Sequence, residues 1–438
     1  MSTHGLTSRA AQPTGTRPGK VLVASVAASS IEYYDFMIYG TAASLIFNSH
    51  FFPSINPTAG VLASFATFAV GFAARPVGAA VFGHFGDKFG RKPALLGAML
   101  LMAIASTLIG VLPTYATIGI AAPIALTVLR CAQGAAVGGQ WGGAALMAIE
   151  HAPPNRRGLF GAIPQLGVPV GMITGTLLFL VLNQVLDADQ FSAWGWRVPF
   201  LLSIMMFPIA YYIHRFIEDT PAFQKADDAL AARSSAAQRS SVFEVLRRPR
   251  QLLLAAGTFV PATIAFYVIN TGMLDYGTRD LGMSKSALLT AVLISMVGWT
   301  VGTLGFAWLS DIVGRRAVFA GGAIFTGIWA FAIFPLVQTR SFGLVVLAAL
   351  VGLLAVGAMQ GPVVALFAEM FPPSVRYAGA SMGTQGANIV GGGLAPLIMV
   401  ALLETTHTTI SVSVYVATAA ALSLIPLAMI GRGRRHAD

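Results

Sequence analysis

The chain has 438 residues, of which 56% are hydrophobic and only 10% are charged, and its mean hydropathy is +0.74. Soluble domains carry about 25% charged residues, so soluble, disordered, fibrous and nucleic-acid-binding classes are excluded. The net charge of +10 comes from short segments between apolar runs, which is typical of a multi-pass membrane protein. Because Cys131 is the single cysteine, an internal disulfide and a cysteine-ligated metal site are excluded as well.

Residues 1–20 are rich in Ser, Thr, Gly, Pro and Arg and contain no apolar core followed by a cleavage site. They are expected to be a disordered cytosolic tail rather than a signal peptide. Twelve apolar segments follow, each long enough to cross about 30 Å of hydrocarbon as a helix. They span residues 21–47, 59–82, 94–112, 118–150, 159–183, 197–217, 251–275, 286–308, 317–337, 343–370, 378–402 and 408–430.

The longest charged interruption divides the twelve segments into six and six. We expect an N-terminal bundle over residues 21–217, a cytosolic central loop over 218–250, a C-terminal bundle over 251–430 and a short cytosolic tail over 431–438. Of the 27 Lys and Arg residues, 21 fall on the side of the N-terminus, and cytoplasmic loops retain positive charge. Both termini are therefore expected in the cytosol of a cell, with the bacterial inner membrane as the expected location.

Two loop patterns occur twice at nearly the same offset. An Asp-x-x-Gly-basic-basic loop begins at Asp87 and again at Asp311, 224 residues later. A Glu-x-x-Pro-Pro-x-x-Arg frame begins at Glu150 and again at Glu369, 219 residues later. The predicted fold is therefore all-α, with twelve transmembrane helices in two homologous six-helix bundles. This arrangement resembles a major facilitator transporter, in which substrate binds near the midplane between two halves that rock.

The charged residues of these loops are expected to form a cytosolic latch. Asp can pair with nearby Arg or accept hydrogen bonds from helix-end amides. Partly exposed pairs contribute about 0–1 kcal/mol each, which is enough to bias two states of nearly equal energy. The alternative is that these residues only fix the topology, although topology does not require Asp or Glu at matched positions. The expected gate residues are Arg75, Asp87, Arg91, Glu150, Arg157, Asp311, Arg315, Glu369 and Arg376.

Two carboxylates, Glu32 and Asp35, lie near the middle of the first segment. A charged group at membrane depth costs at least about 2.5–3.5 kcal/mol, so each is a functional-site hypothesis. Their i, i+3 spacing places them on one helix face, where they are expected to titrate as a coupled pair and to carry the transported proton. The alternative is that one of them only neutralises an arginine within the membrane.

Arg130 is predicted at a depth similar to that of Asp35, in the fourth segment. A guanidinium can hold a carboxylate through two parallel hydrogen bonds, so Arg130 is expected either to bind an anionic substrate or to act as an internal counter-ion. For Arg75, which lies closer to the cytosol, a gating or structural role is favoured. Asp275 is expected at the outer interface rather than buried. The residues expected to bind a small polar substrate are Arg130, Tyr33, Tyr34, Gln133, Gln140, Trp141, Gln165, Gln385 and Asn388.

Glycines recur along the fourth segment at Gly134, Gly138 and Gly142. This spacing places small residues on one helix face, on which another helix can approach closely. The pattern therefore predicts tight helix packing.

Seven short motifs lie along residues 20–430, at residues 32–36 (EYYDF), 74–78 (ARPVG), 87–92 (DKFGRK), 130–134 (RCAQG), 138–143 (GGQWGG), 194–200 (WGWRVPF) and 218–223 (EDTPAF). Together they resemble the metabolite:proton symporter branch of the major facilitator superfamily, which includes shikimate, oxoglutarate, citrate and proline/betaine carriers. The resemblance implies proton-coupled import of a small organic acid or zwitterion by alternating access. None of the motifs identifies the substrate.

Two departures from this branch bear on function. Relatives usually carry Glu where this chain has Gln140, so a coupling scheme that relies on a titratable group at that position is in doubt. The chain also ends eight residues after Ile430 and is expected to lack the long C-terminal heptad segment of the proline/betaine carriers.

Several other functions remain as alternatives to proton symport. A uniporter or a drug/proton antiporter of the same fold is possible, whereas a non-transporting sensor would need an added signalling domain. An enzyme is not expected, because the sequence has no HExxH, GxSxG or P-loop pattern. We expect no cofactor, no metal and no nucleic-acid partner, and a monomer that binds a small metabolite and protons within the lipid bilayer.

Overall fold

The computed structural model describes residues 18–53, 56–89, 91–140, 156–205, 208, 247, 249–371 and 376–430. Every regular element in these ranges is helical. By length and composition, nine of the described helices can cross a membrane, and Leu96–Val111 forms a shorter apolar helix. The predicted tail 431–438, and most of residues 1–20 and 218–250, lie outside the described residues, so the domain boundaries there stay predictions.

Each of the first six predicted segments contains described helix. The elements are α1 (Pro18–Ala42), η1 (Ala43–Phe47), α2 (Asn48–Phe51), α3 (Pro57–Phe89), α4 (Arg91–Val111), α5 (Tyr115–Ile118), α6 (Ala121–Gln140), α8 (Arg157–Ala162), η3 (Ile163–Leu166), α9 (Gly167–Val185), α10 (Ala188–Ala193) and η4 (Gly195–Arg197). Residues 198–205 continue as helix after η4.

The other six predicted segments also coincide with described helices. The elements are α13 (Pro249–Tyr267), η5 (Val268–Gly272), α14 (Met273–Arg279), α15 (Lys285–Val313), α16 (Arg315–Gln338), α17 (Phe342–Met370), α18 (Arg376–Ala387), η6 (Asn388–Gly393), α19 (Ala395–Thr406) and α20 (Ile410–Ile430).

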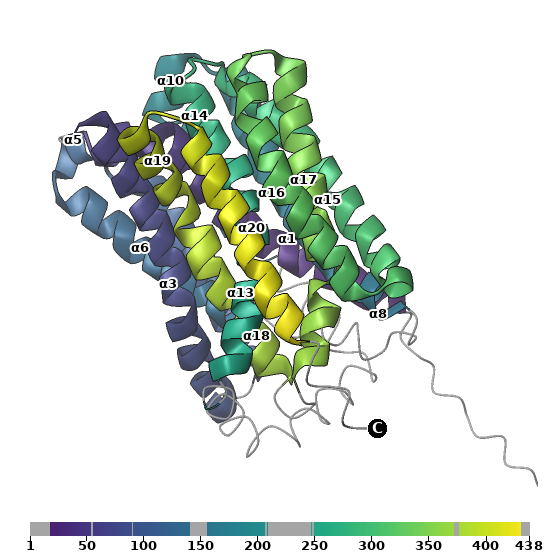
Figure 1. Ribbon diagram of the computed structural model, residues 1–438. Helices are drawn as coiled ribbons and strands as arrows, with labels where there is room; N and C mark the ends of the chain where they lie inside the picture. The colour runs from purple at the N-terminus through teal and green to yellow at the C-terminus, as the bar shows by residue number, and fades with distance from the viewer. Residues whose placement is uncertain are drawn as a thin grey trace, which may run out of the picture.

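The long helices run side by side in one elongated bundle (Figure 1). Elements α10 and α14 lie at one end, which we call the α10 end, and α8 and α18 lie at the other, which we call the α8 end. The two halves of the chain meet where α3 packs on η6 and α19, and where α8 and α9 pack on α15. Any movement of one half relative to the other must therefore change the packing at these contact regions, which we call the seams between the halves.

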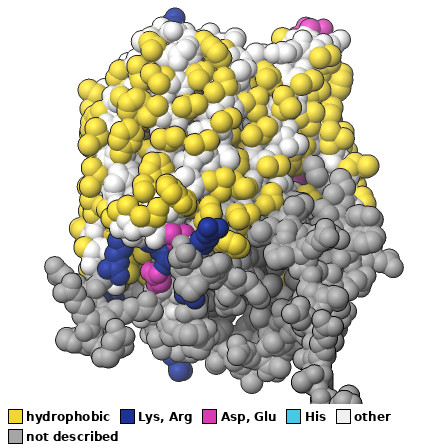
Figure 2. All heavy atoms as spheres, turned by 90° about the vertical axis from the view of Figure 1, so that its right-hand side faces the viewer, with side chains coloured by type: hydrophobic (Ala, Val, Ile, Leu, Met, Phe, Trp, Pro, Cys, Tyr) yellow, Lys and Arg dark blue, Asp and Glu magenta, His cyan; other side chains and the backbone are white. Residues whose placement is uncertain are grey.

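Apolar side chains cover the outside of the bundle along most of its length. Figure 2 shows this on the face formed by the helices at the right of Figure 1, with Lys, Arg, Asp and Glu gathered toward the α8 end. Among the outward-facing residues are Val297 and Val301 of α15 and Ile324 and Ile328 of α16, each more than half exposed. Exposed branched side chains on this scale are costly in water and favourable in lipid, as expected for a membrane-spanning bundle.

The internal repeat extends to the local geometry of the helices. The π-helical turn η1 in the first segment begins at Ala43, and the π-helical turn η5 in the seventh begins at Val268, 225 residues later. The two turns meet at the α10 end, where the Ser44 hydroxyl donates to the Thr271 carbonyl at 3.3 Å. Single π turns inside long helices often mark functional positions, and here they mark equivalent places in the two halves.

Glycines allow α6 to lie directly against α3, as their spacing predicts. A Cβ atom at Gly134 would collide with the backbone of Gly71, and one at Gly138 would collide with the backbone of Arg75. Only Gly permits backbones to approach this closely. The contact fixes Arg75 and Arg130, which lie on the two helices, at neighbouring depths in the N-terminal half.

Candidate functional site

The two carboxylates of α1 are both buried in the N-terminal half. Glu32 is 8% exposed and Asp35 is 1% exposed. Asp35 accepts hydrogen bonds from the hydroxyls of Ser203 and Ser106. Arg75 is the basic group whose charge acts on Glu32, and Arg130 is the one whose charge acts on Asp35. A different arginine thus acts on each carboxylate through its charge, but none of the ion pairs among the described residues includes Glu32 or Asp35.

Asp35 and Arg130 are connected through a chain of hydrogen bonds. Arg130 Nη1 donates to Gln133 Oε1 at 3.2 Å, and Gln133 Nε2 donates to the Ser106 oxygen at 2.7 Å. Because Ser106 accepts from Gln133, its own proton is available to donate to Asp35. The protonation state of Asp35 and the position of the Arg130 guanidinium are thus linked through two neutral side chains.

The Arg130 side chain is completely buried and stacks on aromatic rings. Its guanidinium carbon lies 3.8 Å from the ring centroid of Phe36, 4.2 Å from that of Tyr39 and 4.8 Å from that of Phe68. Within the described part of the chain, no carboxylate lies within ion-pair distance of Arg130, and its Nε and Nη2 have no hydrogen-bond acceptor. Cation–π contacts offset part of the cost of burial but leave those two donors unsatisfied.

Arg75 contacts the same Phe36 ring as Arg130 does. Its guanidinium carbon is 4.3 Å from the Phe36 centroid and 4.6 Å from the Phe72 centroid. Its Nη1 donates to Gln385 Oε1 at 3.2 Å, which joins α3 of the first half to α18 of the second. The gating or structural role predicted for Arg75 stays a prediction, and the structure places the side chain at a contact between the halves beside Phe36.

The other residues predicted to bind substrate lie in different settings. Gln133, Gln165, Gln385 and Asn388 are buried, and Tyr33 is partly buried. The buried Tyr34 hydroxyl donates to the Pro199 carbonyl at 2.8 Å, so it ties α1 to the sixth segment. The Gln140 side chain and all of Trp141 lie outside the described residues.

Sequence reasoning missed three residues of this site. Ser106 and Ser203 hold Asp35, and Phe36 contacts both arginines. Phe36 belongs to the motif that contains Glu32 and Asp35, so its position next to them was a usable signal. The two serines stand alone in apolar segments with no spacing that points to Asp35.

At the α8 end, Asp311 of the second half holds the start of α8 in the first. Its carboxylate accepts the backbone N–H groups of Gly158 at 2.8 Å and Leu159 at 3.1 Å. Arg315 lies 3.6 Å from Asp311 and also pairs with Glu369. These three residues are among those predicted to form a latch. Arg157 is exposed, whereas the side chains of Asp87, Arg91 and Arg376 and all of Glu150 lie outside the description.

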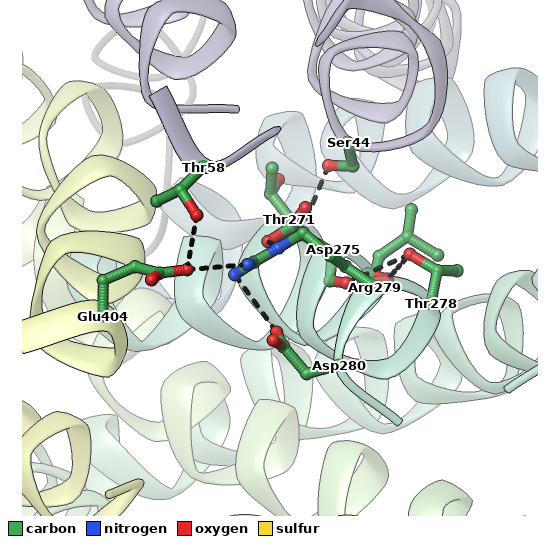
Figure 3. A network of polar contacts seen from close by, with 9 residues as sticks. Ser44, Thr58, Thr271, Asp275, Thr278, Arg279, Asp280 and Glu404 are labelled. Carbon is green, nitrogen blue, oxygen red and sulfur yellow. Dashed lines mark hydrogen bonds and ion pairs between the residues drawn. The ribbon is translucent and has the colours of Figure 1, made fainter. Parts of the chain in front are cut away.

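At the α10 end, Arg279 lies among three carboxylates (Figure 3). It is 2.9 Å from Glu404, 3.1 Å from Asp280 and 3.4 Å from Asp275. Thr58 of the first half donates to Glu404 of the second at 2.8 Å, so the network reaches across the halves. Asp275 is 2% exposed. The expectation that it lies at the interface rather than buried is therefore wrong, because α14 turns it inward beside Arg279.

A family model described as Major Facilitator Superfamily matches residues 26–396. The chain belongs to the major facilitator superfamily. It is 40% identical over 426 residues to the inner membrane metabolite transport protein YhjE of Escherichia coli (strain K12), covering 95% of this chain and 94% of that protein. It is 38% identical over 399 residues to the shikimate transporter of the same organism, covering 89% and 88%.

Solved structures of the superfamily have the same fold. The proton:xylose symporter XylE bound to 6-bromo-6-deoxy-D-glucose superimposes with a TM-score of 0.71 at 16% identity, covering 94% of each chain. A D-xylose-proton symporter gives a TM-score of 0.72 at 17% identity. The family and the fold of twelve helices in two bundles, both expected from the motifs and the repeat, are confirmed, and the protein is a multi-pass membrane transporter of metabolites rather than an enzyme.

Proposed function

We propose that this transporter imports a small organic acid or zwitterionic metabolite together with protons by alternating access. The observation that carries the proposal is the hydrogen-bond chain from Asp35 through Ser106 and Gln133 to Arg130. It links a buried carboxylate, which can take up a proton, to a buried guanidinium with two unused donors, which can bind a substrate carboxylate. Because these hydrogen bonds connect the two sites, proton binding at Asp35 and substrate binding at Arg130 can affect each other.

In this scheme the proton binds first from the side where the site is open. A protonated Asp35 or Glu32 lowers the cost of bringing further negative charge into the low-dielectric centre. The substrate then binds at Arg130, and the halves close around the neutralised site. On the other side, loss of the proton restores the carboxylate, and the substrate leaves because the excess negative charge destabilises it.

Relatives support this class of substrate. Similar proteins include the shikimate transporter and, at 29% identity over 411 residues, the proline/betaine transporter of Escherichia coli (strain K12). The first carries a carboxylic acid, and the second carries zwitterions. An organic acid fits Arg130 directly, because a guanidinium binds a carboxylate through two hydrogen bonds.

The orientation is part of the proposal. We place the α8 end in the cytosol and the α10 end outside, because 21 of the 27 Lys and Arg residues fall on the cytosolic side in that arrangement. We also propose that the protein works as a monomer in a bacterial inner membrane, since the similar protein YhjE is named as an inner membrane protein. Import follows the inward proton gradient across that membrane.

Uptake into liposomes tests the proposal. Purified protein is reconstituted, and labelled shikimate, 2-oxoglutarate, citrate, proline and glycine betaine are offered with and without an imposed pH gradient, acidic outside. We expect one of these solutes to accumulate only with the gradient, and a protonophore to abolish accumulation. Equal uptake with and without the gradient would replace the proposal with a uniporter, the reading that Gln140 favours. Accumulation driven by the opposite gradient would indicate antiport.

A further inference from the structure

Among the described residues, four buried nitrogen donors at the centre of the bundle have no acceptor. They are Nε of Arg75, Nε and Nη2 of Arg130, and Nε2 of Gln385. Gln385 must present its oxygen to Arg75, because a guanidinium can only donate hydrogen bonds, and its NH2 group is therefore the part left over. A buried donor without an acceptor costs about 1–3 kcal/mol, and more when it is charged, so these groups are suited to a ligand that supplies acceptors.

All four unsatisfied groups are donors, and the side chains that carry them are connected through Phe36 and Arg75. Arg130 and Arg75 contact Phe36 at 3.8 and 4.3 Å, and Gln385 is bonded to Arg75. The group of the ligand that binds these four donors must offer several acceptors and no donor of its own. A carboxylate does so, because its two oxygens provide about four lone-pair positions. An ammonium or amide group would add donors where acceptors are missing.

The fixed charges at this depth sum to zero. Glu32 and Asp35 supply two negative charges, and Arg75 and Arg130 supply two positive charges. Among the buried residues described in the second half, the only charged one is Asp275, which lies away from the centre at the α10 end. One bound carboxylate therefore brings the centre to a net charge of −1, and one proton on Glu32 or Asp35 restores neutrality. Each further carboxylate would need a further proton.

We propose that the substrate is a monocarboxylate held between Arg75 and Arg130, with Gln385 as its ligand from the second half, and that one proton accompanies each molecule. This inference rests on the proposed function and narrows it to one substrate class and one stoichiometry. Arg75 releases Gln385 when it turns to the substrate, and the freed amide donates to the same carboxylate. Substrate then replaces the direct bond between the halves, so binding alters the seam at mid-depth.

Whether the substrate is a monocarboxylate can be tested by finding out which compounds the protein retains. Purified protein in nanodiscs is incubated with an equimolar mixture of shikimate, benzoate, lactate, 2-oxoglutarate, succinate, citrate, proline and glycine betaine, and retained compounds are identified by native mass spectrometry. We expect shikimate, benzoate or lactate to be retained and the methyl ester of the retained acid to fail to compete. Retention of a dicarboxylate, a tricarboxylate or a zwitterion, or of no compound, would overturn the inference.

Variants then separate the proposed ligands from general structure. Arg75→Lys keeps the positive charge but loses the planar guanidinium, which can donate two parallel hydrogen bonds. Gln385→Leu removes the amide and keeps a similar side-chain volume. Each should weaken binding of the retained acid about tenfold or more. Gln385→Glu should abolish binding, because its carboxylate would occupy Arg75. The control is Thr384→Val on the same helix, since the Thr384 hydroxyl bonds to its own helix at the Ala380 carbonyl. Unchanged affinity in Arg75→Lys and Gln385→Leu would contradict the site.

The stoichiometry has its own measurement. In reconstituted liposomes, transport of a monoanion with one proton moves no net charge, so solid-supported membrane recordings should show no steady transport current. A current during transport would contradict the one-to-one ratio. The proposed function and this inference can be told apart. Proton-driven uptake of a dicarboxylate would keep the proposed function and overturn the inference. Retention of a monocarboxylate without a response to the pH gradient would overturn the proposed function and the one-proton ratio but keep the substrate class and its three ligands.

Discussion

The hydroxyl of Thr58 donates a 2.8 Å hydrogen bond to Glu404, and the bond joins the start of α3 in one half to the end of α19 in the other. Arg279 holds Glu404 in place at 2.9 Å (Figure 3). At the opposite end, Asp311 joins the halves by accepting the backbone N–H groups of Gly158 and Leu159. Polar contacts therefore join the two halves at both ends of the described bundle, and we expect the loss of the contacts at one end to favour opening of that end.

We predict that Thr58→Val favours a state open at the α10 end. Valine keeps the volume of threonine but cannot donate to Glu404. The reporter is Ser44→Cys in a Cys131→Ser background, because Ser44 is buried at this seam and cysteine is nearly isosteric with it. Thiol labelling of this cysteine from the aqueous side should become several-fold faster. Asp189→Asn, an exposed carboxylate change at the same end, should leave the rate unaltered. An unchanged rate in Thr58→Val would show that this bond does not hold the seam.

Asp311→Asn should favour the opposite opening, at the α8 end. Asparagine loses the charge that binds two helix-end amides and Arg315, and partly exposed charge contacts of this kind are worth about 0–1 kcal/mol each. Ser310→Cys is the reporter, since Ser310 is 2% exposed at the contact between α15 and α8. Its labelling should accelerate while that of Ser44→Cys slows.

The neighbouring change Arg316→Gln serves as the control for this experiment. Arg316 is exposed and contacts only the Ile430 carbonyl among the residues described, so its loss should not alter labelling. If Asp311→Asn labels like the wild type and transports normally, the matched Asp of the two loops only marks topology.

The close contact between α3 and α6 gives a stability prediction. Gly138→Ala places a Cβ against the Arg75 backbone, and overpacking of this kind costs about 1–3 kcal/mol or more when the backbone cannot move. The melting temperature in detergent should fall by several degrees. Gly321→Ala is the matched control, because no atom lies within 4 Å of its Cβ position, and it should be neutral or slightly stabilising. Equal melting temperatures would mean that α6 shifts freely away from α3.

Sequence patterns predicted much of this architecture because lipid imposes simple rules. A membrane helix must be long and apolar, so all twelve predicted segments coincide with described helix. Charged groups inside such helices are rare, and Glu32, Asp35, Arg75 and Arg130 stood out for that reason. The structure buries all four in the same half of the protein.

The partners of these charges could not be read from the sequence. Ser106 and Ser203 lie 71 and 168 residues from Asp35 along the chain, and only helix packing decides that they face it. Gln385 was expected in the site, but its bond to Arg75 was not. Asp275 was misjudged for the same reason, because its depth was estimated from segment length and its inward direction depends on the turn of α14. Charge alone would favour a carboxylate as the partner of Arg130, whereas in the structure its guanidinium stacks on aromatic rings.

The last prediction concerns coupling and follows from the link between Asp35 and Arg130. Asp35→Asn removes the proton-binding group but keeps the size and acceptor oxygen that Ser203 and Ser106 contact. It should abolish accumulation against a gradient while sparing exchange of substrate across the membrane, because exchange needs only binding and rocking. Glu32→Gln should have a similar or milder effect. Counterflow and pH-driven uptake, measured side by side in liposomes, report the two activities separately.

Ser106→Ala tests the link itself, since it removes the hydroxyl between Asp35 and Gln133 without changing any charge. Substrate binding should persist, because Arg130 and its free donors remain, but each transported proton should move less substrate. Ser423→Ala provides the control: that buried serine bonds only to its own helix, at the Ala420 carbonyl, among the contacts described.

Full proton-driven accumulation in both Asp35→Asn and Glu32→Gln would assign α1 a purely structural role. Normal coupling in Ser106→Ala alone would leave the carboxylates as the proton site but show that they act on Arg130 through the electric field rather than through the hydrogen-bond chain.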